Sequence, residues 1–227
     1  MKPIIGINGD VKTEPSPSIN VKLAYVDAVR RAGGIPLVLP AGEPGDAAAL
    51  LDRVDAMVLT GGGDIDTRPG MPLHPSVDLM DPRRQAFDME LVRILLGRPK
   101  PALGICLGMQ MMAYAAGAPL LQHLPDAGLT ALLDHRAAHD VEIERDSRLG
   151  AIMGVNRATV VSHHHQGIAD VPSGFRVAAT APDGVVEAFE APDGMFFIGV
   201  QWHPERDLDA PETARLFRAL VEAARRK

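Results

Sequence analysis

The chain has 227 residues, 46% hydrophobic and 23% charged, a composition that fits a compact enzyme and excludes a disordered or coiled-coil chain. Its formal net charge of −6, with lysines and arginines spread along the chain, argues against a nucleic-acid-binding protein. The single cysteine excludes an internal disulfide, so we expect a cytoplasmic protein. The length of the chain predicts one domain over residues 1–227.

The first half of the chain alternates predicted strands with predicted helices. Short apolar runs at 3–7, 35–39, 56–60 and 101–105 are typical of buried strands. Apolar positions at helical spacing, with capping residues, predict helices over 21–32, 46–54, 81–96 and 107–116. Residues 64–80 contain three prolines and are expected to form a surface loop. This alternation predicts an α/β fold with a mainly parallel sheet flanked by helices.

The second half of the chain has a different pattern, with short predicted strands in close succession. Strand-like runs lie at 141–143, 158–161, 175–179, 185–189 and 195–200, before a closing helix over 211–226. Such a series predicts an antiparallel section beside the parallel sheet. Residues 102–121 are apolar enough to suggest a membrane span, but three glycines and Pro119 interrupt them. We interpret them as a buried strand and helix, and expect no membrane partner.

A candidate nucleophile lies where a predicted strand meets a predicted helix. The segment LGICLGMQ places Cys106 between Gly104 and Gly108, the G-x-Nuc-x-G pattern of a nucleophile elbow. Because the unpaired N–H groups at a helix start favour an anion, we expect the helix from Leu107 to lower the pKa of the thiol. A buried structural cysteine is the alternative, and the elbow pattern favours the nucleophile.

A general base is predicted in the segment GVQWHPE, which follows the last predicted strand. His203 could take the thiol proton and return it to a leaving amine. In extended backbone, residues two apart project to the same side, so Glu205 could orient the imidazole. The sequence thus predicts a Cys106, His203 and Glu205 triad. The developing oxyanion would be held by the backbone N–H of Leu107 and by the glycines at the end of the third strand, Gly62 and Gly63.

Two groups of histidines could suggest a metal. His135 and His139 have the i, i+4 spacing of a helical site but lack the glutamate of an H-E-x-x-H motif. In the run at 163–165 only alternate residues of a strand could share a metal. We therefore expect no metal and no cofactor, and interpret residues 162–166 as a substrate-contacting loop.

The motifs G-x-C-x-G-x-Q at 104–110 and G-V-Q-W-H-P-E at 199–205 resemble those of the class I glutamine amidotransferase superfamily. Within it, the chain is similar to the γ-glutamyl-γ-aminobutyrate hydrolase group over almost its whole length. The resemblance implies a flavodoxin-like open sheet, a γ-glutamyl thioester on Cys106, and binding of the glutamyl moiety by Gln110 and the backbone near Ser162 and His163. A small γ-glutamyl molecule is then the expected partner, and a homo-oligomer stays open.

Several positions depart from the pattern of that group. Asn is expected at Val161, an acidic residue at Gln85, Pro at Thr67, and Gly-Gly at 117–118. None belongs to the predicted triad, so the departures concern the leaving amine. Three functions stay open: a hydrolase of γ-glutamyl amines, a glutaminase subunit serving a separate synthetase, and a binding protein that kept the fold without activity.

Overall fold

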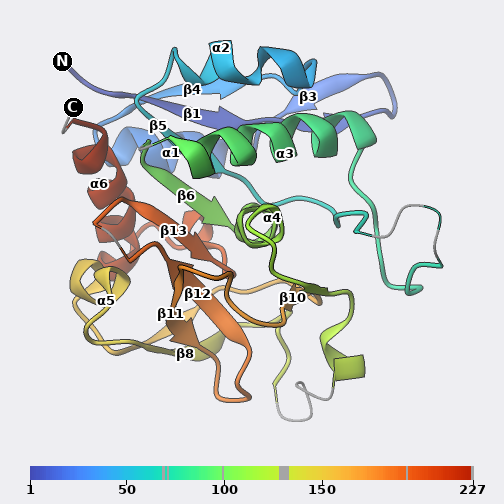
Figure 1. The fold of residues 1–227 in the computed structure, drawn as a ribbon. Coiled ribbons are helices and arrows are strands. Elements are labelled where there is room, and N and C mark those ends of the chain that lie inside the picture. Colours follow the sequence, from blue (N-terminus) through green and yellow to red (C-terminus); the bar gives the residue numbers. More distant parts are fainter. Residues whose placement is uncertain (68–69, 71, 99, 128–132, 193, 226–227) are drawn as a thin grey trace.

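The computed structural model describes residues 1–67, 70, 72–98, 100–127, 133–192 and 194–225. Within these residues the main sheet has nine strands in the order β4-β1-β5-β6-β13-β12-β11-β8-β9, and its strands come from both halves of the chain (Figure 1). Their bounds are β1 Ile4–Asn8, β4 Ile35–Leu39, β5 Ala56–Leu59, β6 Ala102–Ile105, β8 His139–Ile143, β9 Arg157–Val160, β11 Arg176–Thr180, β12 Val186–Glu190 and β13 Phe197–Val200.

The first five strands of that order are parallel and form the centre of the sheet. β5, β6 and β13 are buried along their whole length, as expected for strands covered on both faces. Strand β13 comes last in the chain but lies beside β6, with Val200 opposite Ile105. This register brings the residues after β13 next to the residues after β6, so the two predicted catalytic segments leave the sheet at the same edge.

The remaining four strands of the main sheet are antiparallel to their neighbours. β12 pairs with β13 and with β11, and β8 pairs with β11 and β9. The mainly parallel sheet with an antiparallel section in the second half is therefore confirmed. A register shift interrupts the β11–β12 pairing between Val177 and Thr180, which indicates a bulge there.

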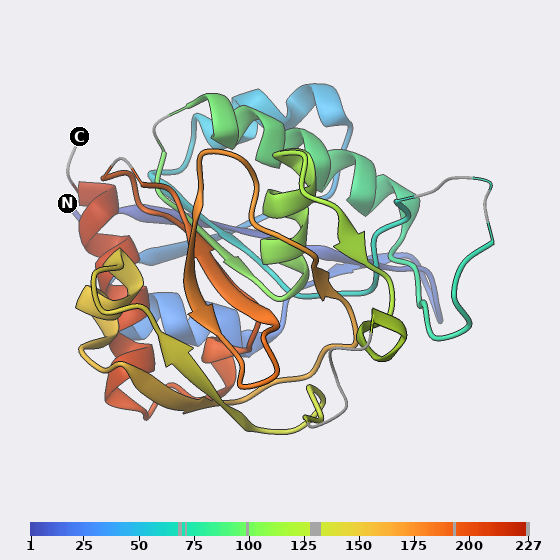
Figure 2. The same ribbon diagram turned by 60° about the horizontal axis from the view of Figure 1, so that its bottom comes forward.

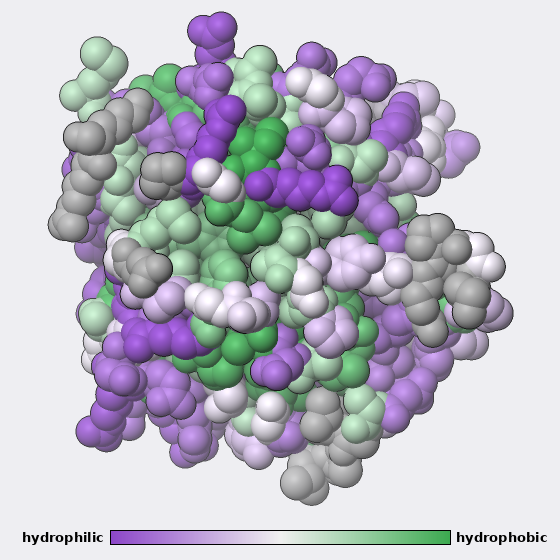
Figure 3. All heavy atoms as spheres, viewed as in Figure 1, coloured by the Kyte–Doolittle hydropathy of each residue, from purple (hydrophilic) through white to green (hydrophobic). Residues whose placement is uncertain are grey.

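Helices cover both faces of the sheet (Figure 2). One hydrophobic cluster includes residues of the helices α1, α5 and α6 and the other includes residues of α2, α3 and α4. Polar residues surround hydrophobic ones on the face that Figure 3 shows. The bounds are α1 Leu23–Arg31, α2 Ala47–Leu51, α3 Pro82–Gly97, α4 Leu107–Ala115, α5 Arg148–Met153 and α6 Pro211–Arg225, with 3-10 helices η1 Pro44–Asp46, η2 Leu124–Ala127 and η3 Pro204–Arg206.

The predicted elements agree with the structure within two or three residues at most ends, and the differences lie in short elements. The predicted helix over 46–54 is η1 followed by α2. A hairpin of β2 Asp10–Lys12 and β3 Ser18–Asn20, the pair β7 Leu120–Leu121 and β10 Gly167–Ile168, and helix α5 were not predicted. The apolar stretch at 102–121 holds β6, α4 and β7. Among the described residues, no helix combines the length and apolar character needed to cross a membrane.

Candidate active site

Cys106 occupies a sharp turn between β6 and α4. Its backbone has φ 52° and ψ −108°, and among the described residues no other residue except glycine has a positive φ. The two flanking glycines make this turn possible by letting chain segments approach closely. A Cβ on Gly108 would lie 2.3 Å from the carbonyl oxygen of Leu59, and one on Gly104 would lie 2.8 Å from the backbone of Gly108. The predicted elbow is thus present, with the strained geometry that presents a nucleophile.

The pKa of the Cys106 thiol is not lowered as the sequence predicted. Burial raises the pKa to about 12, although the backbone N–H of Leu107 acts in the opposite direction and favours the thiolate. The reason is that only 7% of the residue is exposed to solvent, so desolvation of the anion outweighs the helix start. Burial therefore favours the neutral thiol of Cys106.

His203 and Glu205 follow β13 and lie beside the elbow. The Cys106 N–H donates to the carbonyl of Val200 over 2.8 Å, which ties the two segments together. Glu205 Oε1 lies 2.8 Å from His203 Nδ1, so the carboxylate fixes the ring and leaves Nε2 for other partners. The extended backbone predicted for these residues is wrong. Glu205 belongs to η3, and the 3-10 turn brings its carboxylate to the imidazole.

Burial lowers the pKa of His203, and the hydrogen bond and charge of Glu205 partly compensate. The imidazole is therefore neutral near pH 7. A neutral thiol and a neutral imidazole therefore line the same cavity.

The glycines at 61–63 follow β5 and lie next to both predicted catalytic side chains. A Cβ on Gly61 would lie 3.0 Å from His203 Cε1 and 3.6 Å from the Cβ of Cys106. The Gly61 N–H donates to the hydroxyl of Tyr25 over 3.0 Å. Within the described part of the chain, the N–H groups of Gly62 and Gly63 have no hydrogen-bond partner. Their predicted role in holding the oxyanion stays a prediction.

Two residues that support this loop were missed in the sequence. Tyr25 projects from α1, and burial raises the pKa of its hydroxyl well above the usual value, so it stays protonated. Arg84 on α3 is fully buried and donates to Thr60 Oγ1 over 3.0 Å and to the carbonyl of Gly61 over 3.1 Å. Its guanidinium also bonds Asp10 and Asp88. Asp88 lies four residues away on the same helix, but the partners that tie Arg84 to the glycine loop, Thr60 and Gly61, are remote in the sequence, so no local signal identifies this role.

Cavities lie on two sides of Cys106. One of about 350 Å³ reaches His203 and has three basic residues in its wall, Lys12, Lys22 and Arg206, together with Asp10 and Asp78. The other, of about 250 Å³, has a polar wall that includes Gly62, Gly63, Asp64, Gln110, Arg136 and His163. His163, Asp78 and the two glycines line both. The thiol therefore lies at the junction of two small, polar compartments.

The predicted substrate-binding residues differ in their placement. His163 lines both cavities, and Gln110 lines the smaller one while its Nε2 donates to the carbonyl of Gln166 over 3.2 Å. The Ser162 hydroxyl instead donates to the carbonyl of His135, so this side chain supports the fold. The backbone beside it contacts the site, because the His203 N–H donates to the carbonyl of Val161.

The histidine groups are arranged differently from the prediction. His135 and His139 do have an acidic neighbour, Glu187, which β12 brings from 48 residues beyond His139. Of the run at 163–165 it is His164 that reaches Glu187, whereas His165 contacts Asp64 beside the smaller cavity. Residues far apart in the sequence therefore form one buried cluster.

A family model described as Peptidase C26 matches residues 3–205 of the chain. The chain belongs to the peptidase C26 family. It is 40% identical over 209 residues to a Mycobacterium tuberculosis protein provisionally named a glutamine amidotransferase, covering 88% of this chain and 66% of that protein. It is 30% identical over 228 residues to the γ-glutamyl-γ-aminobutyrate hydrolase of Escherichia coli strain K12, covering 89% and 85%.

The fold is also found in solved structures. A glutamine amidotransferase from Thermotoga maritima matches with a TM-score of 0.66 at 17% identity, covering 99% of this chain and 96% of that one. That identity establishes a shared fold and no more. Membership in the C26 family confirms the resemblance found in the sequence and indicates a hydrolase. The bond that this member cleaves is a separate question.

Proposed function

We propose that this chain hydrolyses the γ-glutamyl amide bond of a γ-glutamyl amine through a thioester on Cys106. The observation that carries the proposal is the nucleophile elbow with His203 beside it, the ring held by Glu205 over 2.8 Å. A cysteine, a histidine beside it and an acid that orients the histidine are the parts of an acyl-transfer triad. The relatedness to a γ-glutamyl-γ-aminobutyrate hydrolase supports the choice of bond.

In the first half-reaction, Cys106 Sγ attacks the amide carbonyl carbon while its proton passes to His203 Nε2. The oxyanion accepts hydrogen bonds from the N–H of Leu107 and from Gly62 or Gly63, whose N–H groups have no other partner among the described residues. The carbon–nitrogen bond then breaks as His203 gives the proton to the departing amine. A glutamyl thioester on Cys106 remains.

In the second half-reaction, His203 takes a proton from water, and the hydroxide adds to the thioester carbonyl. The carbon–sulfur bond breaks, the thiolate regains its proton from His203, and glutamate leaves. Glu205 keeps Nδ1 as the donor throughout and stabilises the imidazolium that forms in each step. Both half-reactions use only side chains, backbone N–H groups and water.

The two cavities beside Cys106 suit the two ends of such a substrate. In the smaller one, Arg136 can bind the α-carboxylate of the glutamyl group, and Asp64 and Asp78 can bind its α-ammonium. The larger cavity, with Lys12, Lys22 and Arg206 in its wall, suits an amine that carries a carboxylate. This distribution of charge favours γ-glutamyl-γ-aminobutyrate over a γ-glutamyl diamine.

A glutaminase subunit that supplies ammonia to a synthetase is the second candidate, and the provisional name of the Mycobacterium tuberculosis relative favours it. The same triad would serve both functions. They differ in the need for a partner, because a glutaminase of this kind should be activated by its synthetase whereas a hydrolase acts alone. We infer that this chain acts alone in the cytoplasm.

The test is a substrate panel with the purified chain alone, using product mass detection. γ-Glutamyl-γ-aminobutyrate, γ-glutamylputrescine, glutamine and γ-glutamyl anilide should all be compared at matched concentrations, with Cys106→Ala as the blank. We expect the first to give the highest kcat/KM. A preference for glutamine, or activity that appears only with a cell extract, would favour the glutaminase function, and no turnover of any γ-glutamyl compound would overturn the proposal.

A further inference from the structure

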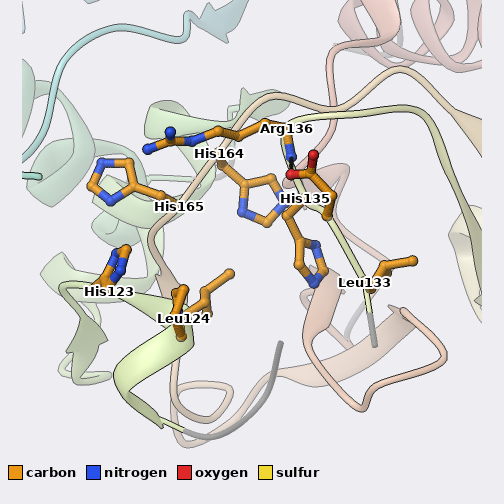
Figure 4. Close-up of a pocket in the computed structure, with 9 residues that line it drawn as sticks. His123, Leu124, Leu133, His135, Arg136, His164 and His165 are labelled. Atoms are coloured by element: carbon orange, nitrogen blue, oxygen red, sulfur yellow. Dashed lines mark hydrogen bonds between the residues drawn. The ribbon is translucent and has the colours of Figure 1, made fainter. Parts of the chain in front are cut away.

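Three buried histidines surround one buried carboxylate in the antiparallel half of the molecule. Glu187 Oε1 lies 3.1 Å from His135 Nδ1, 3.2 Å from His139 Nε2 and 3.3 Å from His164 Nε2. All four side chains are at most 5% exposed, and Glu187 is completely buried. The rings of His135 and His164 lie side by side in the wall of a cavity of about 500 Å³ (Figure 4).

The outer nitrogen of each ring has a partner that can only accept a hydrogen bond. His139 Nδ1 faces the carbonyl of Ala137 over 3.2 Å, His164 Nδ1 faces the carbonyl of Gln166 over 2.8 Å, and His135 Nε2 faces a carboxylate oxygen of Asp183 over 2.9 Å. Each outer nitrogen must therefore carry the proton of its ring. In a neutral ring the inner nitrogen then presents a lone pair to Glu187.

If all three rings are neutral, three lone pairs are directed at one carboxylate, and they repel it unless a proton or a metal ion lies between them. A second observation points the same way. Among the described residues, the other carboxylate oxygen, Glu187 Oε2, has no hydrogen-bond partner, and neither does His164 Nε2. Buried polar atoms of this kind usually have partners, and unpaired ones are a sign of an ion or water that fills the site.

We propose that the cluster holds a zinc ion, bound by His135 Nδ1, His139 Nε2 and the carboxylate of Glu187. The ligand atoms of His135, His139 and Glu187 lie within 4.8 Å of one another. Zinc bonds of about 2.0–2.1 Å in a tetrahedron separate neighbouring ligands by roughly 3.3 Å, and the nitrogen–oxygen separations of the cluster agree with that spacing. Carbonyl or carboxylate partners on the outer nitrogens are the usual support of zinc-bound histidines.

The ion would have a structural role. It would join β8 and β12, and Glu187 also contacts His164 of the segment 162–166, whose His163 and His165 line the smaller cavity beside Cys106. Gln166 connects the two sites, since its carbonyl accepts from both His164 and Gln110. The sequence does not reveal this site, because Glu187 is remote from both histidine groups. The cavity shown in Figure 4 offers a route by which the ion can enter.

The experiment measures zinc binding by the full chain that carries Cys106→Ala, so that the thiol cannot bind the metal. After treatment with a chelator, the protein is titrated with zinc alone, and metal content and melting temperature are recorded. We expect one zinc per chain and a rise in Tm of roughly 5–10 °C at a hundredfold excess over Kd. His139→Gln and Glu187→Gln should weaken binding by at least about 100-fold.

The matched control is His123→Gln. His123 belongs to a second cluster with His74 and Asp126, which is more exposed and could also attract zinc. The control should bind zinc as tightly as its parent. If it alone loses binding, the ion belongs to that exposed cluster, and if no protein binds zinc with Kd below about 10 μM, protons fill the buried cluster. Either result overturns the proposal.

A second measurement needs no substitution at the buried site, in case Glu187→Gln fails to fold. Nitrogen-15 NMR of the histidine side chains reports which ring nitrogen binds a metal. Zinc should change the chemical shift of Nδ1 in His135 but that of Nε2 in His139. Shifts at any other nitrogen, or an unchanged spectrum with zinc, would contradict the assignment.

Discussion

At the scale of single residues, the site couples a neutral thiol to a neutral imidazole. Burial raises the pKa of Cys106 to about 12 and lowers that of His203. Neither group is reactive by itself, so the proposed mechanism requires the proton to move as the sulfur attacks. The energetic consequence is that the base matters as much as the nucleophile, whereas the orienting acid contributes less.

Substitutions at the base and its partner should separate these contributions. His203→Ala should reduce kcat/KM for the best γ-glutamyl substrate almost to the level of Cys106→Ala, because nucleophile and base act as one unit. Glu205→Gln keeps the shape of the side chain. It should reduce kcat/KM by less than the roughly 10⁴-fold known for the orienting acid of a serine triad. Steady-state kinetics give both values. Full activity of Glu205→Gln would reduce the triad to a cysteine–histidine dyad.

The two pKa shifts also predict the pH dependence. His203 accepts a proton only when neutral, and burial lowers its pKa, so kcat/KM should stay flat down to about pH 6.5 and fall only below it. Because the thiol pKa is raised, the ultraviolet absorbance of thiolate should be absent in the free enzyme at neutral pH. The difference spectrum against Cys106→Ala measures it. A thiolate signal that persists below about pH 6 would indicate a cysteine–histidine ion pair instead.

The sequence identifies those residues whose neighbours along the chain carry the signal. Cys106 is recognised by its two glycines, and His203 and Glu205 by their position after an apolar strand. Arg84, Tyr25 and the Glu187 cluster have no such signal, because the fold alone brings their partners to them. The pKa of Cys106 was predicted with the wrong sign for a related reason. A helix start can be recognised in the sequence, but the burial that outweighs it cannot.

At the scale of elements, one helix supports the loop that would hold the oxyanion. Arg84 reaches from α3 to the end of β5, where it bonds Thr60 and Gly61. A Cβ on Gly62 would lie 2.2 Å from the guanidinium, so the loop packs directly on it. Asp88, one turn along α3, holds the guanidinium over 3.0 Å. The position of the loop therefore depends on a buried ion pair.

Removal of that buried ion pair should lower the free energy of unfolding. Arg84→Met leaves the buried Asp88 without its cation, whereas Asp10 keeps Lys12, and loss of one partner of a buried pair costs about 3–5 kcal/mol of unfolding free energy. Urea denaturation measures it. The neighbouring Arg83 pairs with Asp81 at the surface, so Arg83→Met serves as the matched control and should change stability little. Equal effects of the two substitutions would show that the buried network is not what holds α3 against the loop.

The predicted elements agree with the structure where burial imposes a hydrophobic pattern on the sequence. β5, β6 and β13 are uniformly apolar because both faces are covered, and their ends were predicted within two residues. All three residues of β3 are exposed, so the β2–β3 hairpin carries no hydrophobic alternation. The pair β7–β10 joins strands of two residues each, 46 positions apart in the register Leu121 to Gly167. Such pairings depend on tertiary contacts that no local pattern reports.

At the scale of the whole molecule, the candidate site is assembled by the carboxyl ends of parallel strands that come from both halves of the chain. β5 and β6 supply the glycines and Cys106, and β13 supplies His203. The segments around Arg136 and His163 then close the smaller cavity. Residues distant in sequence thus line the smaller cavity on several sides. The larger cavity has long, charged side chains in its wall.

This asymmetry predicts strict recognition of the glutamyl end and tolerance of the amine. A pocket built to bind charged groups rejects a substrate that lacks one, because its own polar groups are then left unpaired. N-acetylation of γ-glutamyl-γ-aminobutyrate, or conversion of its α-carboxylate to an amide, should therefore lower kcat/KM by roughly 10⁴-fold. Changing the leaving amine should lower kcat/KM by less than about 100-fold, since Lys12 in the wall of the larger cavity is exposed to solvent, which weakens its charge interactions.

Competition kinetics measures both series in one assay when mass detection follows the acyl product of each analogue (glutamate, N-acetylglutamate or glutamate α-amide) and, for the substrates with different amines, the amine that is released. Arg136→Gln should selectively weaken substrates that have the free α-carboxylate, and it should leave the already poor amide analogue almost unchanged. That difference distinguishes a direct contact from general damage to the site, which would lower the turnover of every substrate by the same factor. Equal turnover of the N-acetylated and free substrates would contradict the assignment of the smaller cavity to the glutamyl group, because a cavity lined by Asp64 and Asp78 has no means of binding a neutral acetamide as tightly as an ammonium.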